Sequence, residues 1–272
     1  MPDDLLRAAL DHPAYPRSAG YDPAWIARHE MGPNALWLLE ALLAAMPIER
    51  GARVLDLGCG RALTSIFLAR ELDVRVTAVD LWIPAEENRA RIREAGVEDR
   101  VTAVHAEAHA LPFEPGAFDA IVSIDAYQYF GTDDLYLGTP VHLLRDGGRL
   151  GVVVPATLRE LDGPPPAHLA PFWEWEFACF HAPAWWRRHW AKTGLVDVEV
   201  ADAVPDGARD WLRFGRALLP SCTGWRRESW EREIAMLEAD RDGLLGFARV
   251  VARKRAEPAA PGGCGAARGV DA

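Results

Sequence analysis

The sequence predicts an α/β fold with a mostly parallel sheet and helices on both faces. Between residues 33 and 155, apolar strand-like runs alternate with helix-like stretches five times, which is the pattern of parallel sheets. The first of these strands runs directly into a glycine loop, VLDLGCG (54–60), at the position where open α/β sheets bind ligands. Half of the 272 residues are hydrophobic, so the chain can bury a substantial core.

The elements of this alternating region follow from local signals. Pro33 and Pro47 bound the first helix, and Gly96 closes a later one. Alternating β-branched residues mark VRVTAVD as a strand. The predicted order is helix 33–46, strand 53–57, helix 62–72, strand 74–80, helix 85–95, strand 99–108, strand 118–125, helix 135–144, turn 145–148 and strand 149–155.

The rest of the chain departs from this regular alternation. A proline-rich loop, GPPPAHLAP (163–171), is followed by a helix that Gly194 stops and by a strand at 195–202. Two helical stretches occupy residues 206–242, before a last strand at 244–255. The tail from 256 to 272 is rich in Ala, Gly and Pro, so we predict that it is disordered.

Charge and composition exclude several classes of protein. The net charge of -10 argues against nucleic acid as a partner, because phosphate contacts need clustered Lys and Arg. The four cysteines are widely spaced and form no ligand cluster with the eight histidines, so no metal site is expected. Neither a signal peptide nor an apolar stretch long enough to cross a membrane is visible, which predicts a soluble cytoplasmic protein without a membrane partner.

Residues near the glycine loop point to a nucleoside-containing ligand. Gly58 and Gly60 allow a turn with positive φ and a close approach to the backbone. Asp80 ends the next strand, 24 residues after Asp56, where a carboxylate can accept hydrogen bonds from both ribose hydroxyls. The G-x-G-x-x-G dinucleotide fingerprint and a following G-K-[ST] are both absent. These absences disfavour a dinucleotide oxidoreductase and a phosphate-cradling loop.

Taken together, these motifs resemble the class I S-adenosylmethionine-dependent methyltransferases. VLDLGCG looks like their first motif, VTAVDLW like the second, VHAEAHALPFEPGAFDAIVSID like the third and fourth, and LLRDGGRLGVVVP like the fifth strand with its lead-in turn. The resemblance implies a Rossmann-like seven-stranded, mostly parallel sheet with an antiparallel last strand and a helical insert near the C-terminus. It implies a single domain, 1–255, divided into a helical cap (1–50), a cofactor-binding core (51–155), an aromatic lid loop (156–184) and the insert (206–242).

The resemblance also implies S-adenosyl-L-methionine as cofactor and assigns residues to it. Asp80 would hold the ribose, Leu81 and Trp82 would flank the adenine, and Glu107 or Ala108 would meet the adenine amino group. Ala62 and Glu107 depart mildly from the family pattern, which favours glycine and aspartate there. The expected cofactor-binding residues are Asp56, Gly58, Cys59, Gly60, Asp80, Leu81, Trp82, Glu107, Ala108, Ser123 and Met31.

The methyl acceptor is expected beyond the fourth strand, beside Asp125, Tyr127, Gln128 and Tyr129. Asp125 could orient a cationic or a hydroxyl group. The tyrosines could stack on the acceptor, or pack beneath the following helix. His29 is a weaker candidate for a base, on the cap helix that carries Met31.

Five tryptophans lie between residues 173 and 190. Trp186 and Trp190 share a helix face, and with Trp185 they are expected in the core. Trp173, Trp175, Phe177 and His181 precede that helix and are expected to form a pocket wall, with a short β-like edge as the alternative. We therefore predict Asp125, Tyr129 and His181 as catalytic residues, and Tyr127, Tyr129, Trp173, Trp175, Phe177 and His181 as contacts of the acceptor.

The resulting prediction is a methyltransferase that acts on a small molecule, aromatic or amphipathic, in specialised metabolism. Two alternatives stay open: a non-catalytic subunit with the same fold, and a methyltransferase for a lipid-like acceptor. The insert 206–242 could cover the acceptor pocket or form a homodimer surface.

Overall fold

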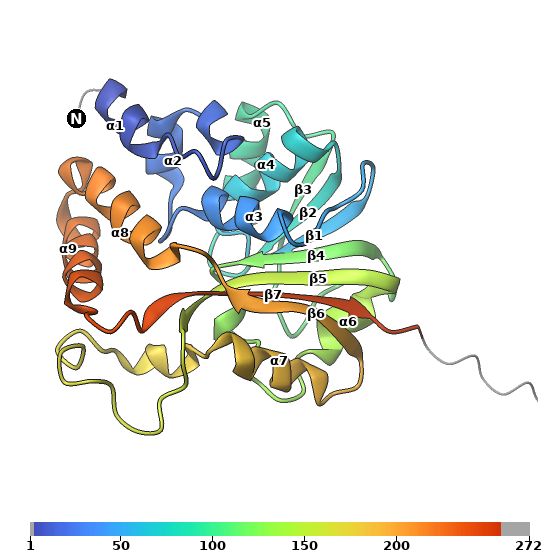
Figure 1. The fold of residues 1–272 in the computed structure, drawn as a ribbon. Coiled ribbons are helices and arrows are strands. Elements are labelled where there is room, and N and C mark those ends of the chain that lie inside the picture. The colour runs from blue at the N-terminus through green and yellow to red at the C-terminus, as the bar shows by residue number, and fades with distance from the viewer. Residues whose placement is uncertain (1–2, 257–272) are drawn as a thin grey trace, which may run out of the picture.

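The computed structural model describes residues 3–256 and contains a seven-stranded sheet between layers of helices (Figure 1). The strand order is β3-β2-β1-β4-β5-β7-β6, and only β7 runs antiparallel to its two neighbours. This confirms the predicted Rossmann-like topology. The strands are β1 (Arg53–Leu57), β2 (Arg75–Asp80), β3 (Val101–His105), β4 (Phe118–Ile124), β5 (Leu144–Thr157), β6 (Val196–Ala203) and β7 (Leu245–Lys254).

Successive side chains of a strand point to opposite faces of the sheet. Both faces of this sheet are apolar, and each packs into its own hydrophobic core. Val54 belongs to one hydrophobic core and Leu55 to the other. Figure 1 shows α3 (Ala35–Leu43), α4 (Leu63–Leu72) and α5 (Ala85–Glu94) on one face, and α6 (Gly138–Leu143) and α7 (Pro183–Ala191) on the other. The strands β1 and β4 are parallel neighbours in the interior of the sheet. Their carboxyl ends therefore lie at the same edge of the sheet.

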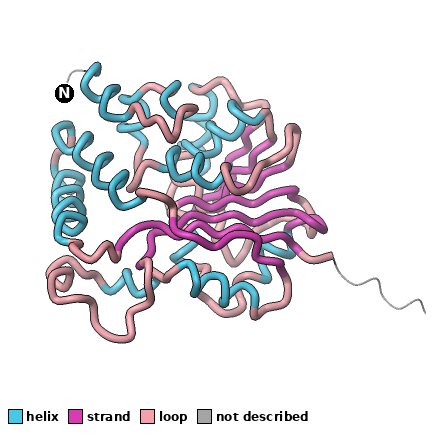
Figure 2. Tube along the Cα trace, viewed as in Figure 1, coloured by secondary structure: helices cyan, strands magenta, loops and turns pink. Residues whose placement is uncertain are grey.

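The N-terminal cap and the helical insert lie side by side (Figures 1 and 2). The Tyr15 hydroxyl and the His12 imidazole both reach Asp210, at 3.1 and 2.9 Å. Arg226 forms an ion pair with the buried Glu30. The cap contains α1 (Asp3–Leu10), η1 (Ser18–Gly20) and α2 (Pro23–His29), and the insert contains α8 (Gly207–Leu218), η4 (Leu219–Ser221) and α9 (Gly224–Ala239).

The apolar face of the insert points into the molecule. Trp211, Phe214 and Trp230 are buried, whereas Trp225 is exposed. The rings of Phe214 and Trp230 pack edge to face at 5.8 Å. This burial favours a role for the insert in covering the neighbouring pocket. The alternative role, a homodimer surface, stays a prediction.

Three local predictions differ from the structure. Helix α6 is shorter than the predicted 135–144, because Leu144 already pairs with Phe118 in the sheet. The predicted turn RDGG (145–148) lies within β5, at the place where the pairing of β5 with β4 shifts its register, and Gly147 has φ +70°. Residues Trp175–Cys179 form a 3-10 helix (η3) in place of a β-like edge.

The expectation for the later tryptophans is confirmed for Trp186 and Trp190, which are fully buried against Tyr127. Among residues 3–256, no helix combines the length and apolar character that a membrane crossing requires. The predicted disordered tail falls almost entirely on residues 257–272, outside the described part of the chain.

Candidate cofactor and acceptor site

The glycine loop after β1 takes a conformation that its sequence explains. Gly58 and Gly60 have φ of +73° and +51°, a region that side chains disfavour. A Cβ on Gly58 would lie 2.4 Å from the Cβ of Ala126, so the loop passes directly against the end of β4. The amides of Gly58 and Cys59 both donate to the Val79 carbonyl, at 2.9 and 3.0 Å, and this fixes the loop to β2.

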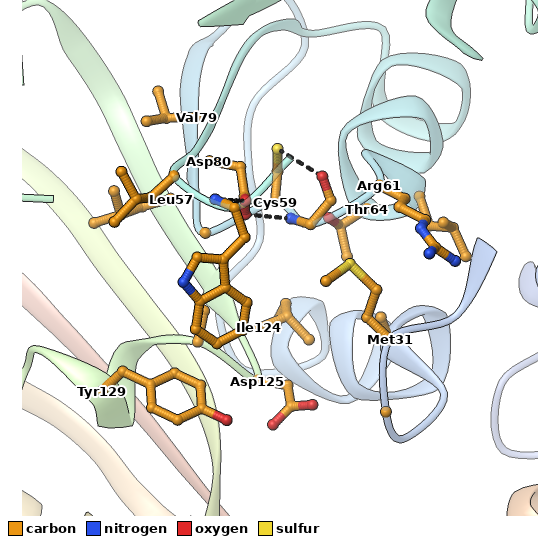
Figure 3. Close-up of a pocket in the computed structure, with 18 of the residues that line it drawn as sticks. Met31, Leu57, Cys59, Arg61, Thr64, Val79, Asp80, Ile124, Asp125 and Tyr129 are labelled. Carbon is orange, nitrogen blue, oxygen red and sulfur yellow. Dashed lines mark hydrogen bonds between the residues drawn. The ribbon is translucent and has the colours of Figure 1, made fainter. Parts of the chain in front are cut away.

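Asp80 holds the same loop from the neighbouring strand. Its Oδ2 accepts a hydrogen bond from the Gly60 amide at 2.8 Å, and its Oδ1 accepts from the amides of Trp82 and Ile83 at 2.8 and 2.9 Å. A carboxylate has about four acceptor positions, so one remains on Oδ2. Asp80 lines the cavity next to the loop (Figure 3). From this position its carboxylate could accept a hydrogen bond from the ribose of the expected cofactor.

Two predicted cofactor residues lie behind the loop and do not line the cavity. Asp56 is fully buried and accepts hydrogen bonds from Thr64 and Ser65, both at 2.6 Å. Burial raises its pKa to about 6 despite these two hydrogen bonds. Ser123 donates to the Leu57 carbonyl at 2.7 Å. The structure therefore gives both residues a positioning role, because Asp56 Oδ2 joins β1 to α4 and the Ser123 hydroxyl joins β4 to β1, while Asp56 Oδ1 has no partner among the described residues.

The cavity occupies the carboxyl edge of the sheet and has a volume of about 300 Å³. This matches the lower end of the range for small-molecule sites. Figure 3 shows Asp80, Met31 and Asp125 around it. Of the predicted cofactor residues, those that line it are Met31, Gly58, Cys59, Gly60, Asp80, Leu81, Trp82, Glu107 and Ala108.

One end of the cavity is suited to a flat heterocycle. Leu81 and Trp82 line it and are 50% and 65% exposed, so they offer apolar surface that no protein group covers. Glu107 also lines it, and hydrogen bonds from His109 lower the pKa of its carboxyl. Met31 also lines the cavity, and its sulfur lies beside the glycine loop, 3.0 Å from the position that a Cβ on Gly60 would take.

Asp125 and Tyr129 lie together on the cavity wall beyond the loop. Asp125 has φ +53°, and its amide donates to the Val153 carbonyl at 2.8 Å. Figure 3 shows the Tyr129 hydroxyl pointing toward the Asp125 carboxyl. Burial, and then the charge of Glu233, raise the pKa of Asp125 to about 8. A carboxyl with such a pKa is largely protonated at neutral pH and exchanges its proton at slightly higher pH.

Tyr127 is the clearest correction among the expected acceptor contacts. It is fully buried and packs edge to face on Phe130, Tyr136 and Trp190. It is therefore a core residue beneath the cavity, which was the alternative weighed for it.

The four residues predicted from the aromatic lid loop do not line the cavity, although Glu176 and Cys179 of the same loop lie near Tyr129. The four residues are Trp173, Trp175, Phe177 and His181. Trp173 and Phe177 pack on the hydrophobic core, and Trp175 is 84% exposed. His181 is held by Glu160 at 3.1 Å and stacks on Trp185 at 3.7 Å. The structure therefore places none of the four in the lining of the cavity.

Sequence reasoning missed several residues of the site. Asn88, on α5, donates to the Gly60 carbonyl at 2.9 Å and is almost fully buried. Arg61 lines the cavity and donates to the Arg28 and Glu30 carbonyls of the cap. Phe214 reaches the cavity from the insert. Arg61 lies inside the first motif and could have been considered, whereas no local signal marks Asn88 or Phe214.

Comparison with known proteins agrees with this architecture. Residues 54–148 match the family model described as "Methyltransferase domain". Methyltransferase GfsG of Streptomyces halstedii is 31% identical over 167 residues, which are 58% of each protein, so the match spans less than two thirds of that relative. Geranyl diphosphate 2-C-methyltransferase of Streptomyces lasalocidi is 28% identical over 90% of this chain and 78% of its own length.

A solved structure extends the likeness to the whole fold. Geranyl diphosphate C-methyltransferase from Streptomyces coelicolor A3(2), in complex with Mg²⁺, geranyl-S-thiolodiphosphate and S-adenosyl-L-homocysteine, superposes with a TM-score of 0.65. The superposition covers 91% of this chain and 84% of the Streptomyces coelicolor protein, and the two sequences are 21% identical. Residues 54–148 thus match a methyltransferase domain, as the resemblance inferred from the sequence predicts, and the superposition shows that the whole chain has the corresponding fold.

Proposed function

We propose that this protein transfers a methyl group from S-adenosyl-L-methionine to a small-molecule acceptor. The observation that carries the proposal is the glycine loop 58–60, which Asp80 holds open beside a cavity of about 300 Å³. The relatives are named for small-molecule methylation, as in the case of geranyl diphosphate.

The residues present fit this cofactor. Gly58 and Gly60 leave a cradle with no side chain, Asp80 keeps one free acceptor position for a ribose hydroxyl, and Leu81 and Trp82 provide an apolar wall for the adenine. Arg61 is the one arginine or lysine among the described lining residues, so we assign it to the carboxylate of the methionine portion.

The cofactor supplies an electrophilic methyl group when bound. The protein's contribution is to align the acceptor with that methyl and to exclude water. Phe214 and Met31 cover the cavity, and Asp125 lies where a proton leaving the acceptor could be held. We therefore assign Asp125 the role of proton acceptor and Tyr129 a role in positioning the acceptor.

Two measurements test this function. Calorimetry should detect S-adenosyl-L-homocysteine binding, and incubation with methyl-labelled S-adenosyl-L-methionine and a panel of small aromatic and amphipathic molecules should yield a labelled product. Cofactor binding without label transfer to any acceptor, lipid-like molecules included, would instead favour the non-catalytic subunit. Absence of cofactor binding would contradict the proposal.

A further inference from the structure

One charged group of the cavity has no adequate partner. Four carboxylates line the described cavity, and three of them are paired: Glu30 by Arg226, Asp80 by three amides, and Glu107 by His109. Asp125 has a single long hydrogen bond, 3.4 Å from the Gln128 amide nitrogen to Oδ1. Within residues 3–256 no arginine, lysine or histidine forms an ion pair with it.

The surroundings of Asp125 add negative charge. Glu233 of α9 is close enough for its charge to raise the pKa of Asp125. The Glu233 carboxyl accepts hydrogen bonds from Trp211 at 2.9 Å and Ser229 at 3.1 Å, but no cation in the described part of the chain pairs with it. Gln128 is 1% exposed, and its carbonyl oxygen has no partner among the described residues. Asp125 on the cavity wall thus has a second carboxyl and an unpartnered amide oxygen near it, and no cation of the described residues pairs with it.

Aromatic rings complete this side of the cavity. The rings of Trp82 and Tyr129 lie 5.5 Å apart, both are partly exposed, and both line the cavity. Ring faces attract cations, more strongly where water is excluded. Phe214 adds an apolar wall from the insert.

We propose that the acceptor binds as a protonated amine, with its ammonium group against the Asp125 carboxylate, beside the rings of Trp82 and Tyr129, and with Glu233 behind. This assignment rests on the proposed function and names the chemical class of its acceptor. A cation stabilises the ionised form of Asp125, which its surroundings otherwise keep protonated at neutral pH. A neutral hydroxyl gives the ionised form no such stabilisation.

The same charges disfavour an anionic acceptor. The geranyl diphosphate methyltransferase relative is named for a diphosphate substrate. In this chain a diphosphate would face the Asp125 carboxyl, and Arg61, the only arginine or lysine among the described lining residues, is assigned to the cofactor. No arginine or lysine of the described lining is then left to compensate the charge of an anion.

The reaction balances with one proton held by Asp125. The ammonium first gives a proton to the Asp125 carboxylate and becomes a neutral amine with a free electron pair. The nitrogen then forms a bond to the methyl carbon while the carbon–sulfur bond breaks, and its electron pair stays on sulfur. The products are a methylated ammonium and the neutral thioether, and Asp125 releases the proton to solvent.

The experiment compares three probes of similar size on protein saturated with S-adenosyl-L-homocysteine: benzylamine, benzyl alcohol and benzoate. We expect benzylamine to bind about tenfold more tightly than benzyl alcohol, and benzoate not to bind. Because burial and Glu233 keep Asp125 largely protonated at neutral pH, amine binding should also release a proton. The binding heat should then vary with the ionisation enthalpy of the buffer.

Variants separate this charge recognition from general effects. Asp125→Asn should remove the preference for the amine, since asparagine has nearly the same shape and tolerates φ +53°. Glu233→Gln should reduce the preference and keep an oxygen for Trp211 or Ser229. Glu228→Gln, on the exposed face of the same helix, is the control and should match wild type.

Three outcomes would overturn the inference: equal or tighter binding of the alcohol or benzoate, an unchanged preference in Asp125→Asn, or no benzylamine binding at millimolar concentration. If methyl transfer occurs with alcohols only, the proposed function stands and the amine assignment falls. If S-adenosyl-L-homocysteine does not bind wild-type protein, the proposed function itself fails and the inference falls with it.

Discussion

The two sides of the cavity are built in different ways. On the cofactor side, the end of β1 and the end of β2 meet, and Asp80 is fixed there by the backbone amides of Gly60, Trp82 and Ile83. On the acceptor side, Asp125 is bordered by the cap and the insert, which are joined by contacts such as Glu30–Arg226 across nearly 200 residues. Asp80 on the first side is held by three hydrogen bonds before a ligand binds, whereas the Asp125 carboxyl on the second side has a single long one.

This difference implies a division of roles. A site whose polar groups are all held by the fold can be rigid and specific for one cofactor. A site with uncompensated carboxyls stores free energy that an acceptor of the right charge recovers on binding. Substitutions on the two sides should therefore differ in whether they affect stability, cofactor affinity or acceptor choice.

The largest effect is expected for Gly58→Val on the cofactor side. A β-branched side chain at φ +73° is strained, and its Cβ would meet the Ala126 Cβ at 2.4 Å. We expect a loss of about 2–5 kcal/mol in the free energy of unfolding, together with loss of S-adenosyl-L-homocysteine binding. Denaturant unfolding and calorimetry measure both.

Gly60→Ala is the matched control for this prediction. Its φ of +51° is also unfavourable, but the nearest atom is the Met31 sulfur at 3.0 Å, on a flexible side chain. Gly60→Ala should lower both the free energy of unfolding and the affinity for S-adenosyl-L-homocysteine less than Gly58→Val does. Retained cofactor binding in Gly58→Val would mean that the ligand lies elsewhere.

A second prediction concerns the contact between the cap and the insert. Arg226→Ala leaves the Glu30 carboxylate buried without its cation, although the Gly32 amide still donates to it at 3.0 Å. Because the Arg226 side chain is 31% exposed, we expect the substitution to lower the free energy of unfolding by about 2–3 kcal/mol. This is less than the loss expected when a fully buried ion pair is broken. Hydrogen exchange should report faster opening of α2 and α9 than of β1. Uniform destabilisation across all elements would argue against a separate cap–insert unit.

A third prediction is a pH dependence of stability that originates on the acceptor side. The pKa of Asp125 rises from 3.8 to about 8 on folding, through burial and the charge of Glu233. The folded state therefore binds this proton more tightly, so the stability that it gives is present below the unfolded pKa and is lost as pH rises toward about 8.

Asp125→Asn tests this titration. Above about pH 8 the variant should be at least about 1 kcal/mol more stable than wild type, and this advantage should disappear near pH 4. Unfolding by urea at a series of pH values is the measurement. A variant that is destabilised equally at every pH would contradict the view that Asp125 is an uncompensated acid.

The smallest effect is expected for Trp175→Ala in the lid loop. Its side chain is 84% exposed and lies outside the cavity lining, so stability should change by less than about 0.5 kcal/mol. Cofactor affinity and probe binding should be those of wild type. Weaker benzylamine binding in this variant would mean that the loop moves over the cavity when the acceptor binds.

The sequence predicted the cofactor side well because its signals are local. The loop glycines, Asp80 and the alternating strands are contiguous in the chain, and the element order dictates where they meet. Glycine spacing even anticipated the two positive φ values. Asn88 escaped notice because its role depends on how α5 docks against the loop, which no residue pattern records.

The acceptor side was predicted less well because its geometry is tertiary. Aromatic composition indicated a pocket wall in 172–181, but Trp173 and Phe177 pack on the core. Phe214 and Glu233 come from an insert whose docking partner could not be read from its own sequence. Tyr127 and Tyr129 are two residues apart, and only the structure separates the buried ring from the exposed one.

The most direct test of the central claim is calorimetric titration of S-adenosyl-L-homocysteine into wild-type protein and Asp80→Asn. The asparagine keeps an oxygen for the Trp82 and Ile83 amides but presents an N–H to the Gly60 amide and the ribose. We predict binding to wild type and an affinity about 5–150-fold weaker in the variant, equivalent to about 1–3 kcal/mol. No binding to wild type, or equal affinity in both, would contradict the assignment of this loop as the cofactor site.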